Sequence, residues 1–150
     1  SSTVNSGQVG TKFTASTVPV LTWEAWLYDD LGMTGPGTNV GYGRIDDQAH
    51  IVITDAAHPL AAGLSGLVAV VPGTTPLRWG APAASAQVVA VAEGNAAQAL
   101  VFAYEAGAAM VGQTAPARRV GLPFYDENPS QFTAESWALF DAAVSWAIGN

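Results

Sequence analysis

The chain has no cysteine among its 150 residues, and this absence removes several kinds of chemistry. Without thiols the protein has no thiolate nucleophile, no thiolate metal site and no disulfide framework. Cationic side chains are also scarce, because Lys and Arg number 5 against 12 Asp and Glu, for a formal net charge of −7. Nucleic acids and anionic membranes are bound through many cations, so this balance argues against both as partners. The single lysine and the acidic balance favour an extracellular or cell-surface location.

Long apolar runs are absent as well. No segment approaches the roughly 20 apolar residues of a membrane-spanning helix. Residues 1–3 show no signal-peptide pattern, so any export signal would lie outside this sequence. With 49% hydrophobic and 11% charged residues, the composition is that of a folded chain. We expect a single domain over residues 1–150, which at this length buries roughly 70% of its extended surface.

What the sequence does contain is a series of short, continuous apolar segments. They occupy residues 18–21, 51–53, 67–71, 88–91 and 100–104. Segments of this length that are rich in Val and Ile, without alternating polar residues, are typical of strands covered on both faces. A helix of the same length would be marginal. The predicted fold class is therefore α/β, a sheet flanked by helices.

Three helical segments are predicted. The clearest is 133–148, with Thr133 as N-cap, Glu135 in the first turn and Gly149 at the end. One face of it carries four large apolar residues, which we expect to pack on the sheet: Trp137, Phe140, Val144 and Ile148. A second helix is expected over 6–15, with Ser6 as N-cap, and a short third one over 24–31. The Gly-rich stretch 32–43 is predicted to be a loop.

Connection lengths predict how the strands pair. The long connection between residues 21 and 51 has room for a crossover, so these two strands are expected to be parallel. The connection between residues 91 and 100 is too short for that and predicts an antiparallel hairpin. Residues 118–124 should return beside 100–104. The expected sheet is mixed, parallel in its first half and an antiparallel meander in its second.

The segment T-D-A-A-H-P-L-A-A-G-L at residues 54–64 resembles the D-x-x-H-P-hydrophobic-x-x-G-L signature of trehalose-utilisation-type (ThuA-like) domains. These belong to the class I glutamine amidotransferase-like, flavodoxin-like superfamily. Residues 104–107, 118–122 and 137–147 resemble the hairpin turn, returning strand and closing helix of that family. Residues 18–24 and 28–33 are similar to modules appended to large secreted bacterial proteins, many of which act on polysaccharides.

The resemblance implies a flavodoxin-like domain that lacks its N-terminal strands. Such domains begin with a β-α-β-α-β unit, whereas this chain opens with polar residues. We therefore expect the chain to be the C-terminal part of a larger protein, whose missing strands complete the sheet. The amidotransferases of the superfamily use a Cys-His-Glu triad, and that activity is excluded here because the chain has no cysteine.

Candidate ligand-binding residues follow the predicted strands. Trp23 and Glu24 end the first apolar segment, where ligands bind in open α/β sheets. The alternative is that Glu24 starts a helix and Trp23 belongs to the core. Trp26 and Trp79 are candidate exposed platforms for a sugar ring, although aromatic side chains are more often buried.

A second group of candidates flanks the C-terminal hairpin. Tyr104, Glu105, Arg119 and Asp126 would converge if the strands pair as predicted, and an arginine among carboxylates can orient a ligand bidentately. The alternative is a structural ion pair that joins the two strands of the hairpin.

The remaining candidates concern catalysis and metals. His58 could take part in catalysis with Asp55, or hydrogen-bond the turn that follows it. Two adjacent carboxylate pairs could bind calcium, or be solvated turn residues: Asp29 with Asp30, and Asp46 with Asp47. No EF-hand, nucleotide-binding or nucleophile-elbow motif is present, so no metal and no cofactor is predicted.

Together these observations favour a non-catalytic accessory module of a secreted or surface bacterial protein. Its role would be binding, with polysaccharide as a candidate ligand, or assembly with the remainder of its own protein or a complementary chain. One alternative is a carbohydrate-active enzyme of the trehalose-utilisation type, with Glu24 or His58 as general base and Arg119 orienting the substrate. Such an enzyme needs all three in one pocket, whereas a glycan-binding module needs an exposed aromatic pair. A further alternative is a structural subunit that assembles through sheet edges.

Overall fold

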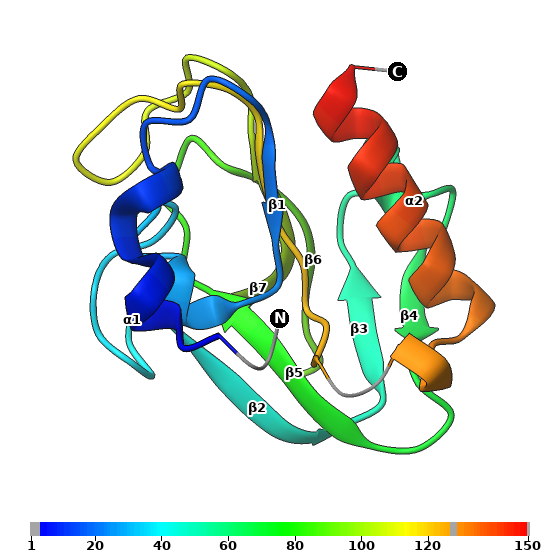
Figure 1. Cartoon of the computed structure of the whole chain (residues 1–150). Helices are drawn as coiled ribbons and strands as arrows, with labels where there is room; N and C mark the ends of the chain where they lie inside the picture. The colour runs from blue at the N-terminus through cyan, green and yellow to red at the C-terminus, as the bar shows by residue number, and fades with distance from the viewer. Residues whose placement is uncertain (1–3, 127–128, 150) are drawn as a thin grey trace.

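A computed structural model describes residues 4–126 and 129–149, and its described strands form one eight-stranded sheet (Figure 1). The strands are β1 (Val20–Thr22), β2 (Tyr42–Gln48), β3 (His50–Ile53), β4 (Gly66–Ala69), β5 (Thr75–Gly80), β6 (Gln87–Ala92), β7 (Asn95–Tyr104) and β8 (Arg119–Gly121). The α-helices are α1 (Ser6–Val9) and α2 (Ala134–Ile148), and the short 3-10 helices are η1 (Gly10–Phe13), η2 (Ala25–Leu27), η3 (Pro59–Ala61) and η4 (Pro129–Gln131).

The sheet is mixed but mostly antiparallel. Its order is β1-β8-β7-β6-β3-β4, with β5 joined to β7 and β2 joined to β5. Among the described strands, only β1 and β8 pair in parallel. The predicted parallel first half is therefore wrong, because β1 and β3 are not neighbours. A long connection permits a crossover without requiring one, and here it contains η2, an irregular segment and the unpredicted strand β2.

The C-terminal meander is confirmed. Strands β6 and β7 form an antiparallel hairpin whose turn is Glu93–Gly94, with Gly94 at a φ of 76°. Glycine suits this turn because it adopts positive φ without steric cost. Strand β8 then returns antiparallel to β7, with Ala103 opposite Val120. Short connections therefore predicted strand direction correctly.

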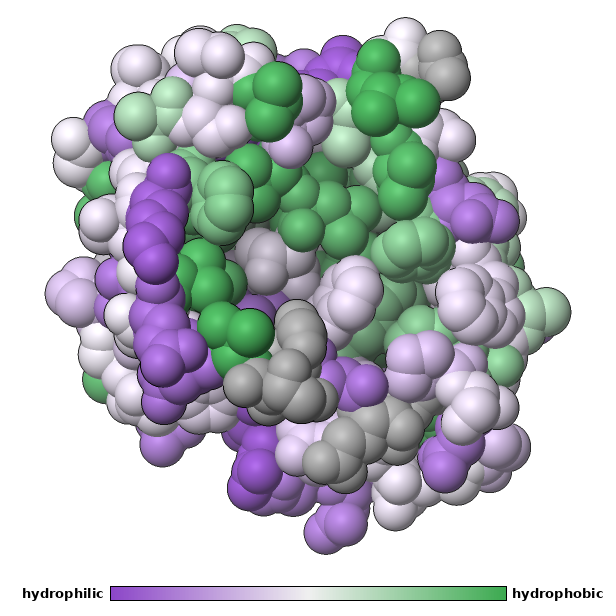
Figure 2. Space-filling model, viewed as in Figure 1, coloured by the Kyte–Doolittle hydropathy of each residue, from purple (hydrophilic) through white to green (hydrophobic). Residues whose placement is uncertain are grey.

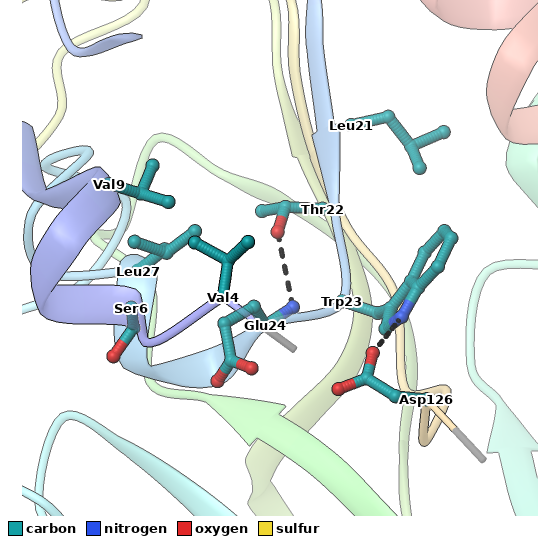
Figure 3. A pocket seen from close by; sticks show the side chains of 9 residues that line it. All are labelled: Val4, Ser6, Val9, Leu21, Thr22, Trp23, Glu24, Leu27 and Asp126. Carbon is teal, nitrogen blue, oxygen red and sulfur yellow. Dashed lines mark hydrogen bonds between the residues drawn. The ribbon is translucent and has the colours of Figure 1, made fainter. Parts of the chain in front are cut away.

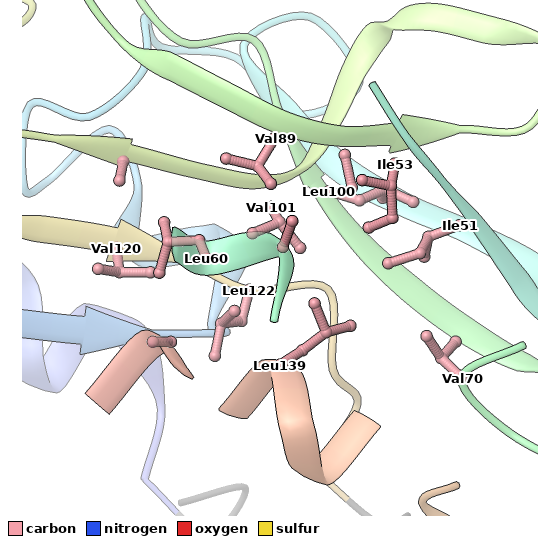
Figure 4. Packing of buried hydrophobic residues seen from close by; sticks show 14 of the residues in the cluster. Ile51, Ile53, Leu60, Val70, Val89, Leu100, Val101, Val120, Leu122 and Leu139 are labelled. Carbon is pink, nitrogen blue, oxygen red and sulfur yellow. The ribbon is translucent and has the colours of Figure 1, made fainter. Parts of the chain in front are cut away.

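The sheet is covered on both faces, as the continuous apolar segments predict. On β7, Val101 and Ala103 face the cluster that contains Leu139 of α2, and Figure 4 shows the packing of that cluster. The next residues along, Phe102 and Tyr104, face a second buried cluster. That second layer is formed largely by η2 and the irregular segment after it, with three fully or almost fully buried side chains, Tyr28, Leu31 and Met33.

Helix α2 begins and ends as predicted, but it buries a different face. Thr133 accepts a hydrogen bond from Ser136 N–H at 3.2 Å, and Gly149 ends the helix at a φ of 84°. The buried residues are Ser136, Leu139, Ala143, Trp146 and Ala147. The expectation that Trp137, Val144 and Ile148 pack on the sheet is wrong, because they are exposed. The two stripes have the same spacing, and the small side chains of the buried one allow close approach to the sheet.

The predicted helix over 6–15 is instead α1 followed directly by η1, and its N-cap is Asn5, not Ser6. The short helix expected after Glu24 is present as η2, and Glu24 caps it by accepting a hydrogen bond from Trp26 N–H at 3.2 Å. Strands β2 and β5 were not predicted. Their sequences, YGRIDDQ and TPLRWG, interrupt apolar residues with charge or proline, so neither forms a continuous apolar segment.

Phe102 occupies a place that two glycines leave open. A Cβ at Gly121 would lie 2.5 Å from its ring, and a Cβ at Gly80 would lie 2.9 Å from it. Both contacts are shorter than van der Waals packing permits. We therefore expect Gly121→Ala to lower the free energy of unfolding by about 1–3 kcal/mol through overpacking. Urea unfolding measures the effect, and Gly73→Ala is the matched control because a Cβ there meets nothing within 4 Å. Equal stability of the two variants would contradict the packing.

Candidate functional site

Among the described residues, the outer edge of β1 has unpaired backbone groups. Val20 N–H donates to Arg118 C=O at 3.0 Å, and Thr22 C=O accepts from Leu122 N–H at 3.0 Å, so both of these residues turn toward β8. Successive residues of a strand direct their backbone groups to opposite sides, which places the N–H and C=O of Leu21 on the outer side. Within residues 4–126 and 129–149, no strand pairs with that side.

An apolar groove follows this edge. Two adjoining cavities of about 200 and 360 Å³ share four lining residues, Val9, Leu21, Thr22 and Leu27. We call their union the β1 groove; its other lining residues are Val4, Ser6, Trp23, Glu24 and Asp126 toward the carboxyl end of β1, and Phe13, Ser16, Val18, Pro19, Val20 and Leu31 toward the amino end. Figure 3 shows its carboxyl end, and α1 lies along one side of β1 in Figure 1.

The exposed stripe of α2 lies beside the same edge of the sheet. The Phe140 ring packs edge-to-face on Trp23, with the ring centroids 6.1 Å apart, and on Trp137 at the same distance. This contact turns the stripe of Trp137, Phe140, Val144 and Ile148 toward β1. Figure 2 shows a hollowed apolar area on this face of the molecule. The open edge of β1 therefore lies between α1 with η1 on one side and α2 on the other.

Carboxylates mark one end of the groove. Asp126 Oδ1 accepts a hydrogen bond from Trp23 Nε1 at 2.7 Å (Figure 3), and Glu24 caps η2. In the part of the chain that the structure describes, the two ion pairs are Arg44 with Asp46 and Arg118 with Glu105. Neither groove carboxylate is therefore in an ion pair there. The groove combines an apolar floor and an acidic end.

Arg119 does not reach the groove, which corrects the expectation that it orients a ligand. It is fully buried. Its Nη atoms donate to five carbonyl oxygens at 2.7–3.4 Å, those of Thr14, Ser16, Val18, Ala117 and Arg118. Burial lowers the pKa of the guanidinium from its ordinary value. Arg119 thus ties the segment before β1 to the segment before β8.

The expected convergence of Tyr104, Glu105, Arg119 and Asp126 is also wrong. The buried Tyr104 hydroxyl donates to Met33 C=O at 2.6 Å and accepts from Ala83 N–H at 2.8 Å. Burial raises the pKa of Tyr104. Glu105 forms its ion pair with Arg118, at 2.8 Å, instead of with Arg119. A structural ion pair is therefore present beside the hairpin, but it involves the neighbouring arginine.

His58 holds the turn that follows it. Its Nδ1 accepts from Leu60 N–H at 3.1 Å, and its Nε2 lies 3.2 Å from Gln87 Oε1. Asp55, its proposed catalytic partner, accepts from Ala57 N–H instead. Neither His58 nor Arg119 lines the groove that contains Glu24. The condition set for the enzyme alternative, one pocket shared by these three residues, is not met.

The expected aromatic platform does not form. Trp79 is only 5% exposed and packs in the core with α2, so the prediction that it is an exposed platform is wrong. Trp26 is partly exposed, but its ring contacts Tyr42 and the guanidinium of Arg78. Trp79 points inward because successive side chains of β5 lie on opposite faces of the sheet, and its own lies on the face that α2 covers.

The acidic pairs make local contacts. Asp29 accepts from Asp30 N–H at 3.0 Å, and Asp46 pairs with Arg44 at 2.8 Å. Asp47 adopts a φ of 56° at the irregularity in β2. Among the described residues, no group of three or more His, Asp or Glu is placed to hold a metal ion. No helix in the same residues is long and apolar enough to cross a membrane.

Arg78 is a site residue that sequence reasoning missed. It lies on β5, with its guanidinium between the rings of Trp26 and Tyr125 at 4.6 and 4.8 Å from their centroids. The only signal was an arginine within a short apolar stretch, P-L-R-W. That signal becomes informative once the two aromatic rings are known to meet there.

Comparison with protein-family models, with curated proteins and with solved structures gives no match for this chain. The functional interpretation therefore depends on the geometry described above.

Replacing Arg119 should destabilise the fold. We expect Arg119→Lys to lower the free energy of unfolding by about 3 kcal/mol. An ammonium group has three donors on one nitrogen, so it cannot bond to the carbonyls of both chain segments at once. Arg44→Lys is the control on an exposed arginine and should change stability by less than about 0.5 kcal/mol. Both are measured by urea unfolding. A loss within the range of the control would show that the carbonyl contacts of Arg119 contribute little.

Tyr28 should make the protein sensitive to alkali. Its hydroxyl is fully buried and donates to Leu122 C=O at 2.9 Å, and burial raises its pKa above the ordinary value of 10.0. A raised pKa stabilises the fold below pH ~10, and this stability is lost as the pH rises above that value. Thermal unfolding between pH 7 and 11 should therefore show a smaller alkaline loss for Tyr28→Phe. An unchanged slope would contradict this assignment.

Proposed function

We propose that this chain is a non-catalytic accessory module of a larger secreted or surface-associated bacterial protein, and that its role is assembly. The observation that carries the proposal is the open edge of β1 within an apolar groove. The occupant would be an extended strand, supplied by the remainder of the same protein or by a complementary chain. It would pair with β1 and continue the sheet, as in strand-addition complexes generally.

The chemistry of the groove suits a strand. Leu21 offers one N–H and one C=O at the edge, which another backbone can satisfy. Successive side chains of a strand point to opposite faces of the sheet. The side chains of an added strand would therefore contact α1 and η1 on one face and the stripe of α2 on the other. The most exposed apolar side chains of the groove are large, with Phe13 53% and Val18 64% exposed. Contiguous apolar surface of this kind is typical of an interaction site.

The path of the chain supports a parallel direction for the added strand. Val4 and Ser6 lie at the carboxyl end of β1 beside Glu24, whereas Phe13 and Val18 lie toward its amino end. The segment 4–19 thus runs back along β1 before entering it, as the connection between two parallel strands does. An added strand connected to β1 in this way would run parallel to it. The sheet would then acquire the parallel half that the resemblance to flavodoxin-like, ThuA-like domains implies.

Hydrogen exchange tests this proposal. In the isolated chain the amide of Leu21 should exchange rapidly, whereas that of Val20, bonded to β8, should be protected. In the intact secreted protein, pairing should slow exchange at Leu21 by about a hundredfold or more. NMR or mass spectrometry with fragmentation resolves these positions.

The opposite edge of the sheet provides the control. Strand β4 pairs only with β3 among the described strands. Val70 N–H donates to Ala49 C=O, so Val70 and every second residue before it face β3. The amide of Leu67 lies between two of these residues and therefore points outward. Leu67 should exchange rapidly in both forms. Fast exchange at Leu21 in the intact protein would refute strand addition at β1, and slowing at both edges would indicate general association.

A further inference from the structure

Arg78 differs from the other arginines in what its guanidinium contacts. Arg44 and Arg118 pair with carboxylates, and Arg119 donates to backbone carbonyls. Arg78 is 8% exposed, and among residues 4–126 and 129–149 its side chain has aromatic contacts but no hydrogen bond or ion pair. Its Nε is buried without an acceptor, as is the Nε of Arg119, but the Nη atoms of Arg119 donate to carbonyls, whereas those of Arg78 donate to no described group. It is the only arginine in that part of the chain whose guanidinium lacks an acceptor.

The two rings hold the guanidinium in place but offer no hydrogen-bond acceptor in its plane. Trp26 and Tyr125 contact it at 4.6 and 4.8 Å and favour the cation through their π faces. A guanidinium carries five N–H donors in its plane, and of those of Arg78 the Nε–H is buried without a partner. A buried cation without an anion is costly. An acceptor-only group with planar oxygen geometry, a carboxylate or a phosphate, is the partner that best completes it.

The position of Arg78 is also that of a binding residue. Its backbone N–H donates to Pro123 C=O at 2.8 Å, just beyond the end of β8. Trp26 belongs to η2, which Glu24 caps at the end of β1. The guanidinium therefore lies near the carboxyl ends of the two parallel strands. In open α/β sheets, this end of parallel strands is where ligands bind.

We propose that Arg78 binds the oxyanion group of a small ligand, with the rings of Trp26 and Tyr125 holding the guanidinium in position. The site is separate from the edge of β1, so it does not depend on strand addition. A carboxylate and a phosphate share the required chemistry, and the experiment distinguishes them.

Titration of the chain with sodium glucuronate and with inorganic phosphate, at constant ionic strength maintained with chloride, tests the site. We expect a saturable change in the NMR signal of the Trp26 indole N–H with one of the two anions, and no change at Trp137, which lies on α2. Arg78→Gln should weaken binding at least about tenfold. Arg44→Gln is the matched control, because Arg44 lies directly opposite Arg78 on β2 but is exposed and paired with Asp46.

The outcomes separate clearly. Response to glucuronate alone identifies a carboxylate site, and response to phosphate alone identifies a phosphate site. Lack of saturation with both anions, or equal weakening by Arg44→Gln, would overturn the proposal. If Arg78→Gln does not fold, as judged by circular dichroism, Arg78→Lys retains the charge without the planar donors and should still bind at least several-fold more weakly. The wild-type comparison of Trp26 with Trp137 needs no variant, and equal shifts at both would also overturn the site.

Discussion

The position of β1 depends on one buried guanidinium. Arg119 donates to carbonyls before β1 and to carbonyls before β8, so a single planar group joins the starts of the two parallel strands. Strand β1 has only three residues and pairs on one side among the described strands, so its ladder alone provides few hydrogen bonds. Because the charge is buried, its contacts with the carbonyls are not weakened by water. The clamp holds the start of β1 beside β8, and the groove follows the other side of the strand.

A second constraint concerns the face of the sheet opposite α2. Phe102 fits there because Gly80 and Gly121 on the adjacent strands have no side chains. Tyr28 packs edge-to-face on Phe102 and bonds to Leu122 C=O. The covering layer can therefore lie close to the sheet although it is largely irregular. Its closeness also brings Trp26 to Arg78, so the packing of the core and the proposed oxyanion site have a common origin.

The edge of β1 and the site at Arg78 lie near the same end of the sheet but suit different partners. The edge presents backbone groups and large apolar side chains, which another polypeptide segment can satisfy and cover. Arg78 presents a cation held by two rings, which suits a small anion. The chain has a net charge of −7, yet among the described residues the guanidinium of Arg78 has no carboxylate partner. The proposed strand addition and the proposed anion binding therefore use different groups of the chain.

The sequence pattern alone predicted the helix ends, the hairpin turn and the strand directions that neighbouring residues decide. Thr133 and Gly149 delimit α2, Glu93–Gly94 forms the turn of a hairpin, and short connections specify strand direction, all because neighbouring residues decide these features. Strands β2 and β5 escaped prediction because their sequences do not repeat with a strand's period, and their pairing with each other is what makes them strands.

The sites are features of the tertiary structure. Arg118 and Arg119 are adjacent and chemically alike, yet Arg118 makes a partly buried ion pair with Glu105 and Arg119 is fully buried, which no local pattern distinguishes. Helix α2 has two stripes of similar spacing, and packing on the sheet selected the one that contains the small residues Ser136, Ala143 and Ala147. Composition and periodicity thus determined the class of fold and its C-terminal half. The exposed edge, the position of Arg78 between two aromatic residues and the buried faces were decided by contacts between residues far apart in the chain, because burial is a property of the assembled structure.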